Sequence, residues 1–190
     1  VYSYDIAKAL SDEAVKQSKT CKIHIKLDTG MGRIGFKTDG SETDEIVKSC
    51  LLPGIEPYGV FSHFAVADTP DDEYTKKQFE LFMNQIEVLG QQGIRFVKRH
   101  ICNSAGILRF PEMHLDLVRA GIILYGLMPP GCPEPVVDID LKPVMNWYAK
   151  VIHVKTVPAG TTVSYGRHFK AERTTEVTTV GIGYADGLSR

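Results

Sequence analysis

The feature that most constrains the fold is an alternation of strand-like and helix-like segments between residues 5 and 127. β-Branched and apolar residues mark three strands, CKIHIKLD (21–28), IEPYGVFSHF (55–64) and RFVKRHICNS (95–104), and a short fourth, LDLVRAG (115–121). Strands that alternate with helices predict right-handed βαβ crossovers and a parallel sheet. The pattern indicates an α/β domain, either the later half of a (β/α)8 barrel or a doubly wound sheet.

Helices are expected at residues 5–16, after residue 41 and at 71–89. Residues 41–44, Ser-Glu-Thr-Asp, have the spacing of a capping box in front of an apolar periodic segment. The longest helix has one apolar stripe, which is typical of a helix that buries a single face. The stripe consists of Phe79, Phe82, Met83, Ile86 and Leu89.

The pattern changes after residue 127. Residues 128–143 contain five prolines, which indicates a linker. Beyond it, strand character recurs with no helix between the strands, at residues 151–157, 161–166 and 174–184. We therefore expect a partial barrel at 1–127, a proline-rich linker at 128–143 and the start of an all-β domain at 144–190. Both ends interrupt patterned sequence, so we expect an internal piece of a longer protein.

Composition excludes several functional classes. A net charge of −1 and a pI near 6.6 argue against a general nucleic-acid or anionic-membrane surface. No apolar run approaches the ~20 residues of a membrane span. The four cysteines, Cys21, Cys50, Cys102 and Cys132, are far apart and form no metal-binding pair. We interpret them as reduced thiols of a cytoplasmic protein, with disulfides as the alternative.

The stretch KLDTGMGRIGF (26–36) ends the first predicted strand with three charged residues, Lys26, Asp28 and Arg33, in a glycine-rich turn. Glycine permits positive φ angles, and successive amides in such a turn can bind an anion. The stretch lacks the phosphate-loop sequence, and its glycine spacing is a weak dinucleotide signal. It is therefore either a structural turn or part of an active site at the strand ends.

Other polar residues follow the next two predicted strands. His63 ends the second strand, and Asn103 and Ser104 end the third. Ser104 could donate to a phosphate and Asn103 could orient a ring substituent. Taken singly, each is equally compatible with a structural histidine or an ordinary polar turn.

The fourth predicted strand leads into VRAGIILYG. Arg119 in this apolar run needs a partner, because an unpaired buried charge is costly. Gly121-Ile122 could begin a helical turn that offers free amides to an anion. In the predicted β domain, Tyr184 lies in the glycine-flanked turn GYADG. The six histidines are scattered without metal-ligand spacing, so no metal site is predicted.

Taken in order, KLDTGMGRIGF, SHFAVAD, CNSAGILRFP, LVRAGIILYG, VSYG and GYADG resemble the alanine racemases along the whole chain. The resemblance implies an enzyme dependent on pyridoxal 5'-phosphate (PLP) that interconverts L- and D-alanine and supplies D-alanine for bacterial cell-wall peptidoglycan. It also implies a PLP-binding (β/α)8 barrel followed by a β domain, in a homodimer whose active site is shared across the interface.

The resemblance also implies roles for the strand-end residues. Ser104 matches a serine that contacts the cofactor phosphate, together with two backbone amides. Arg119 matches the arginine that hydrogen-bonds the pyridine nitrogen, and His63 is placed to bond that arginine. The implied cofactor-binding residues are His63, Asn103, Ser104, Arg119, Gly121 and Ile122. This chain departs from the family at Ala120, where proline is usual.

The implied catalytic residues are Tyr184, Arg33 and Lys26. Arg33 matches an arginine that contacts the phenolic oxygen of the cofactor and the substrate carboxylate. Lys26 matches a lysine that is carbamylated in many members and would then pair with Arg33. Tyr184 matches one of two acid/base groups; the other is the PLP-binding lysine, expected N-terminal to Val1. The 190-residue chain alone is therefore expected to be inactive.

Three alternatives stay open. The protein could racemise serine or another small amino acid, which would be decided by pocket residues largely outside this chain. It could bind PLP without turnover, although such a protein would not need Tyr184 as a second base. A barrel metal hydrolase with a carbamylated lysine would need clustered histidines, which the sequence lacks.

Overall fold

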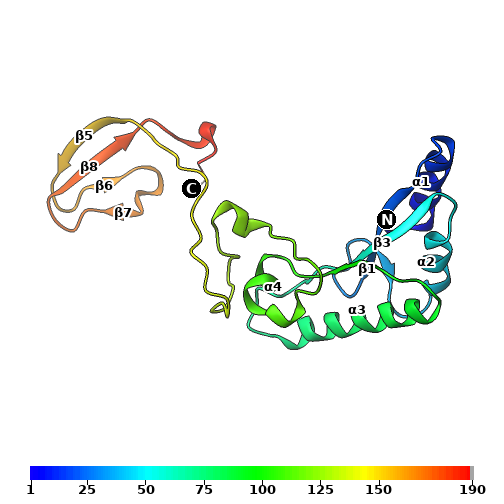
Figure 1. The fold of residues 1–190 in the computed structure, drawn as a ribbon. Helices are drawn as coiled ribbons and strands as arrows, with labels where there is room; N and C mark the ends of the chain where they lie inside the picture. Colours follow the sequence, from blue (N-terminus) through cyan, green and yellow to red (C-terminus); the bar gives the residue numbers. More distant parts are fainter. Residues whose placement is uncertain (189–190) are drawn as a thin grey trace. The chain divides into compact units, whose positions relative to one another are not determined.

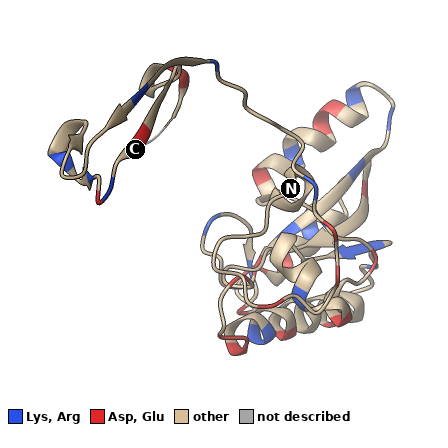
Figure 2. Ribbon diagram, turned by 90° about the vertical axis from the view of Figure 1, so that its left-hand side faces the viewer, with Lys and Arg blue, Asp and Glu red and all other residues tan. Residues whose placement is uncertain are grey.

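The computed structural model describes residues 1–188 and separates into two compact units, Val1–Val144 and Met145–Arg190 (Figure 1). Residues 189 and 190, the last two of the expected β domain, lie outside the described residues. Lys, Arg, Asp and Glu are all distributed over both units (Figure 2), which agrees with a net charge near zero.

The first unit is built on a parallel sheet. Its strands are β1 (Cys21–Asp28), β2 (Phe36–Lys37), β3 (Ile55–Phe61) and β4 (Lys98–His100), in the spatial order β2-β1-β3-β4. The register pairs Lys26 of β1 with Phe61 of β3, and Phe61 with His100 of β4. The predicted parallel sheet is confirmed, and the carboxyl ends of three strands lie level with one another.

Helices connect these strands and cover the sheet. They are α1 (Tyr4–Lys16), α2 (Thr43–Cys50), α3 (Glu73–Gln91) and α4 (Ser104–Arg109), followed by the 3-10 turns η1 (Pro111–Met113) and η2 (Ile122–Tyr125). The apolar stripe predicted for α3 is confirmed, because Phe82 and Leu89 are fully buried in the same core as Ile25 and Val60. Each such side chain contributes about 1.5–3 kcal/mol when it is withdrawn from water. The α3 helix runs alongside the sheet (Figure 1).

The predicted capping box of α2 is wrong, although the helix forms. The helix begins at Thr43 after Glu42, and no side chain caps it. The Ser41 hydroxyl donates instead to the carboxylate of Asp39. The chain turns at Gly40, which has φ +90°, so Ser41 lies within that turn rather than at the helix end.

The predicted fourth strand at 115–121 is also wrong. This segment makes one backbone bond to β4, from Asp116 N to Arg99 O, and one to the residues after it, from Arg119 N to Cys102 O. Between them, the Arg99 amide donates to the Asp116 carboxylate at 2.9 Å rather than to a backbone carbonyl. Leu115 has a positive φ of 54°. A side chain has therefore replaced a ladder bond, and no regular strand results.

The other two predicted strands are shorter than expected. The predicted strand at 55–64 ends at Phe61, and the one at 95–104 is regular only over Lys98–His100. Backbone pairing continues past the end of β3, since Ser62 N donates at 3.2 Å to the carbonyl of His100, the last residue of β4. His63 and Asn103 therefore lie on irregular segments that directly follow the strands β3 and β4.

The second unit is a pair of two-stranded antiparallel sheets. One joins β5 (Val151–Val157) to β8 (Thr175–Val180), and the other joins β6 (Thr162–Val163) to β7 (Phe169–Lys170). The strand at 151–157 is confirmed, and residues 145–188 contain no α-helix. The segments predicted at 161–166 and 174–184 are strands only in part and continue into the 3-10 turns η3 (Tyr165–Arg167) and η4 (Tyr184–Asp186).

The cysteines form no disulfide among themselves, and the two in apolar segments are buried. All four are free, and Cys50 and Cys102 are buried in the core of the first unit. Burial raises the pKa of both thiols to about 12, so they stay protonated. No helix within residues 1–188 combines the length and apolar character needed to span a membrane.

The loop from β1 to β2 depends on glycine. Gly30, Gly32 and Gly35 all have positive φ angles. A Cβ on Gly35 would lie 2.8 Å from the nitrogen of Asp28, whereas a Cβ on Gly32 would have nothing within 4 Å. Gly35 therefore provides space as well as conformation where the loop returns to β1.

This difference predicts unequal effects of alanine at the two positions. In the protein that contains this chain, Gly32→Ala should lower the free energy of unfolding by about 1 kcal/mol, the cost of a left-handed backbone. Gly35→Ala should cost at least about 3 kcal/mol, because strain and a backbone clash add. Urea titrations of both variants provide the measurement, and equal losses would contradict the close approach.

Candidate active site

Arg119 lies at the centre of a cluster at the carboxyl ends of the strands. Its Nη1 donates to Nδ1 of His100 at 2.6 Å, and its Nη2 donates to the Ser62 carbonyl at 2.7 Å and to Nδ1 of His63 at 3.2 Å. The guanidinium carbon lies 5.3 Å from the centroid of the Phe61 ring. The expected contact between His63 and Arg119 is therefore present. No carboxylate among residues 1–188 pairs with this arginine.

The histidines around Arg119 are neutral. Burial, reinforced by the Arg119 charge, lowers the pKa of His63 and that of His100 to about 4. Because arginine only donates, Nδ1 of His100 accepts, and its Nε2 carries the proton. That Nε2 lies 2.8 Å from Nδ1 of His24, whose pKa burial also lowers. The chain from Arg119 through His100 to His24 orients the guanidinium without cancelling its charge.

Ser104 forms a small cradle with the backbone after Arg119. Its Oγ accepts from the amides of Gly121 at 2.9 Å and Ile123 at 3.4 Å, and the residue is 6% exposed. The sequence predicts the amides of Gly121 and Ile122; here Ile122 begins η2 between the two amides that reach the hydroxyl. Donors that converge on one point suit an anionic oxygen.

Lys26 is almost fully buried, and its Nζ donates to the Leu27 carbonyl at 2.6 Å. Its pKa is lowered to about 8, mainly by burial; the Asp28 carboxylate opposes this shift, and the charges of Arg119 and Arg33 add to it. More of this amine is therefore neutral near pH 8 than in an ordinary lysine. Arg33 itself is exposed on the glycine loop.

The local charge balance favours an anion. Asp28 is the acidic residue closest in sequence to Lys26 and Arg33. Its Oδ1 already accepts from the amides of Gly30 and Gly32, each at 3.0 Å. These amides contribute to the lowered pKa of Asp28. Three cations, Lys26, Arg33 and Arg119, remain around the strand ends. Their excess positive charge suits a ligand with phosphate or carboxylate groups.

Asn103 has a mainly structural set of contacts. Its Oδ1 accepts from the Gly106 amide at 3.0 Å and so caps α4, while its Nδ2 donates to the Phe64 carbonyl at 3.2 Å. The same nitrogen lies 3.4 Å from Nε2 of His63. Contact of Asn103 with a ring substituent stays a prediction.

Tyr184 belongs to the second unit. It begins η4, is 66% exposed, and is held in a turn in which the Gly183 amide donates to the Asp186 carboxylate at 2.9 Å. The glycine-flanked turn is confirmed. A role for Tyr184 as an acid/base group stays a prediction.

Sequence reasoning missed the residues that hold Arg119 in place. Phe61, Ser62, His24 and His100 were not singled out as site residues. One signal was available: His24 and Lys26 are two residues apart on one strand and therefore share a face. The contact of His24 with His100 across two strands needs the sheet register, which that spacing does not supply.

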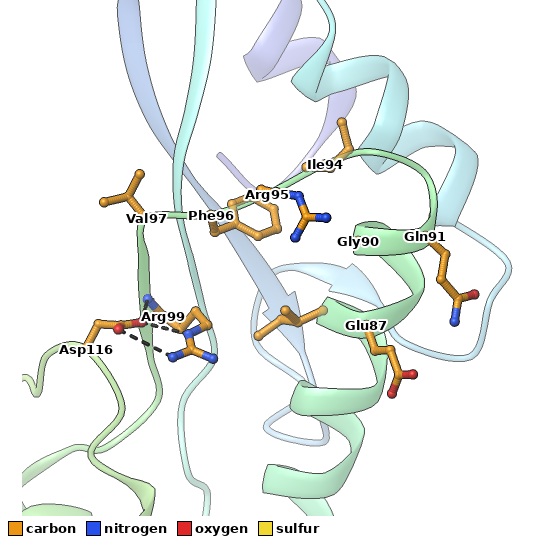
Figure 3. A pocket seen from close by; sticks show the side chains of 10 residues that line it. Glu87, Gly90, Gln91, Ile94, Arg95, Phe96, Val97, Arg99 and Asp116 are labelled. Carbon is orange, nitrogen blue, oxygen red and sulfur yellow. Dashed lines mark hydrogen bonds and ion pairs between the residues drawn. The ribbon is translucent and has the colours of Figure 1, made fainter.

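A hollow of about 540 Å³ lies away from this cluster, between the end of α3 and the amino end of β4 (Figure 3). Arg95, Phe96 and Val97 line it, and Arg99 is ion-paired there with Asp116 at 2.7 Å. Enzymes with parallel barrels carry their chemistry at the carboxyl ends of the strands instead. Within residues 1–188, no three His, Cys, Asp or Glu side chains are grouped to hold a metal ion.

Together, these features define an α/β protein of parallel strands and helices whose strand ends suit an anionic ligand, with a separate β unit. The family model "Alanine racemase, N-terminal domain" matches residues 1–129, and "Alanine racemase, C-terminal domain" matches residues 144–190. The chain belongs to the alanine racemase family. The α/β unit is thus part of the family's barrel, and the alternative of a doubly wound sheet is excluded.

Relatives of the chain carry the same name. It is 49% identical to an alanine racemase of Clostridium tetani and 44% identical to one of Desulforamulus reducens, over the whole of this chain and 49% and 51% of theirs. An alanine racemase structure from Clostridium difficile 630 matches with a TM-score of 0.81 and 36% identity, over all of this chain and 50% of that one. The chain spans about half the length of the curated relatives it matches.

Proposed function

We propose that the protein containing this chain is a PLP-dependent alanine racemase, and that this chain supplies most of the cofactor pocket and one of two acid/base groups. The observation that carries the proposal is the convergence of Arg119, His63 and Ser104 at the carboxyl ends of the strands. Membership of the family supports the reaction class. The whole protein's activity, substrate and partners are part of this proposal.

The residues present fit PLP. The phosphate would bind at the cradle formed by Ser104 and the amides that follow Arg119, where donors converge. Among residues 1–188, no side-chain carboxylate is hydrogen-bonded to Ser104 or to these amides. Arg119 would donate to the pyridine nitrogen: its Nη atoms are engaged, and its Nε has no protein partner among residues 1–188. The bound cofactor supplies an electron-withdrawing ring that acidifies the Cα proton of alanine.

Arg119 holds its own proton and does not release it at ordinary pH. It therefore stabilises less negative charge on the ring than a proton donor would. Arg33, on the glycine-rich loop between β1 and β2, would bind the substrate carboxylate and the phenolic oxygen of the cofactor. Racemisation needs a base on each face of Cα, and Tyr184 would serve one face, with a lysine outside this chain serving the other.

We also propose the organisation that the resemblance implies. Residues 1–127 form the barrel part, residues 128–143 a linker and residues 144–190 the start of the β domain. The protein would act in the cytoplasm as a homodimer that shares the active site across its interface and would supply D-alanine for peptidoglycan. A racemase for serine or another small amino acid is the alternative, distinguished by comparing kcat/KM for alanine and serine.

Removal of the Ser104 hydroxyl should weaken cofactor binding. A hydrogen bond to a charged group contributes about 1.5–3 kcal/mol, so Ser104→Ala in the whole protein should raise the Kd for PLP about 10- to 100-fold. Absorbance titration of the apoprotein measures this. Ser49→Ala is the matched control, because its buried hydroxyl bonds the Glu45 carbonyl within α2. An unchanged Kd in Ser104→Ala, or an equal change in both variants, would contradict the cradle.

The neutral fraction of Lys26 should react with carbon dioxide. The amine attacks the carbon atom, forms a carbamate and releases one proton, so acid reverses the reaction. Reversal of the charge would attract Arg33 and Arg119 instead of repelling them. In 13C-bicarbonate, NMR of the whole protein should show about one carbamate per chain near pH 8 and less as the pH falls.

Lysine variants test the assignment of that signal. Lys26→Ala should abolish it, and Lys22→Ala, on the same strand but with a side chain 60% exposed, should leave it intact. A free amine at Lys26 in the assembled protein would show that the carbamate is absent.

Tyr184→Phe should separate proton transfer from cofactor binding. Loss of one acid/base group should lower kcat for racemisation about 10²- to 10⁴-fold, while the Kd for PLP stays within about twofold. Cα proton exchange with solvent should persist for the enantiomer that faces the remaining base. Tyr148→Phe, in the same unit and 86% exposed, is the control. Equal losses of PLP binding and turnover would contradict the role of Tyr184.

A further inference from the structure

One face of α3 holds the glycine loop. The hydroxyl of Tyr74 donates to the Gly30 carbonyl at 2.9 Å, and one helical turn later Nε2 of Gln78 lies 3.4 Å from Oγ1 of Thr29. The Tyr74 hydroxyl leaves no room for a side chain at Gly30. The loop that carries Arg33 is thereby attached to the helix at two consecutive residues.

Gln78 also holds the strand end that carries His63. Its Oε1 accepts from the Ala65 amide at 2.9 Å, and its Nε2 donates to the His63 carbonyl at 3.1 Å. The side chain has no exposed surface. Both ends of its amide are therefore bonded, which sets its orientation. Removal of this amide would leave buried backbone groups without partners.

A directed chain of hydrogen bonds runs from Gln78 toward the charged groups. Ser62 donates to the Leu27 carbonyl at 2.8 Å, so the Thr29 hydroxyl, 2.8 Å away, donates to Ser62 and accepts from Gln78. The Leu27 carbonyl is also the acceptor of Lys26 Nζ, and the Ser62 carbonyl accepts from Arg119. The chain thus links the helix to Lys26 and Arg119.

We propose that Tyr74 and Gln78 are positioning residues that set the distance between the Arg33 loop and the Arg119–His63 pair. Both act through backbone groups and the Thr29 hydroxyl. This inference rests on the proposed function for its kinetic consequence, because Arg33 would bind the substrate carboxylate. Its structural consequence, an ordered glycine loop, does not depend on catalysis.

The test uses two variants with matched controls in the whole protein. Tyr74→Phe removes one hydroxyl, and Tyr2→Phe is its control, since Tyr2 is 46% exposed and Tyr74 39%. Gln78→Met removes the amide at similar volume, and Gln85→Met is its control. Gln85 is also buried in α3 but donates to Thr43 Oγ1, away from the glycine loop.

We expect amide hydrogen exchange of residues 31–34 to become about tenfold faster in Tyr74→Phe and Gln78→Met and to stay unchanged in both controls. The KM for alanine should rise about threefold to tenfold in the same two variants, with kcat changed less than twofold. Gln85→Met should lower the Tm without these effects, which separates positioning from stability.

Unchanged exchange and KM in Tyr74→Phe would overturn the inference, and this variant decides even if Gln78→Met does not fold. Faster loop exchange in a protein that shows no racemase activity in any form would leave the positioning role standing and reject the proposed function. Racemase activity together with unchanged loop exchange in both variants would support the proposed function and reject the positioning role.

Discussion

A partly buried arginine held only by neutral partners is the interaction on which the site depends. Arg119 donates to two imidazoles and to backbone carbonyls, and its charge is not paired with a carboxylate within residues 1–188. Burial of a cation in this way is costly unless an anion completes the site. Burial lowers the pKa values of His63, His100 and Lys26, and the Arg119 charge adds to each shift. The histidines around Arg119 therefore add little positive charge to the site.

The surrounding structure keeps this charge in place. The register of β1, β3 and β4 sets Lys26, Phe61 and His100 level with one another, and Phe61 stacks on His100 at a centroid distance of 5.1 Å. The α3 helix then ties the following loops together through Gln78. Preorganised groups of this kind need little rearrangement when a ligand binds. The site is thus a property of the sheet and helix as well as of the residues that would touch a ligand.

Local patterns predicted much of this fold because they depend on neighbouring residues. The strand at 21–28 and the helix at 71–89 follow from periodicity, and Ser104 lies just after a strand as the sequence predicts. The strand predicted at 115–121 fails because a tertiary contact, Asp116 with the Arg99 amide, replaces a ladder bond. The roles of His24, His100 and Gln78 depend on which groups face them across strands. The local sequence around a strand histidine does not distinguish one that hydrogen-bonds an arginine from one that packs in a core.

The Asp116 contact has an evolutionary consequence. A peptide carbonyl is present whatever residue occupies a position, so a substitution does not remove the acceptor of a ladder bond. The carboxylate that stands in for it at the start of the Arg119 segment disappears with a single missense change. A single substitution at Asp116 can therefore shift the segment that carries Arg119 without changing any residue that bonds its guanidinium.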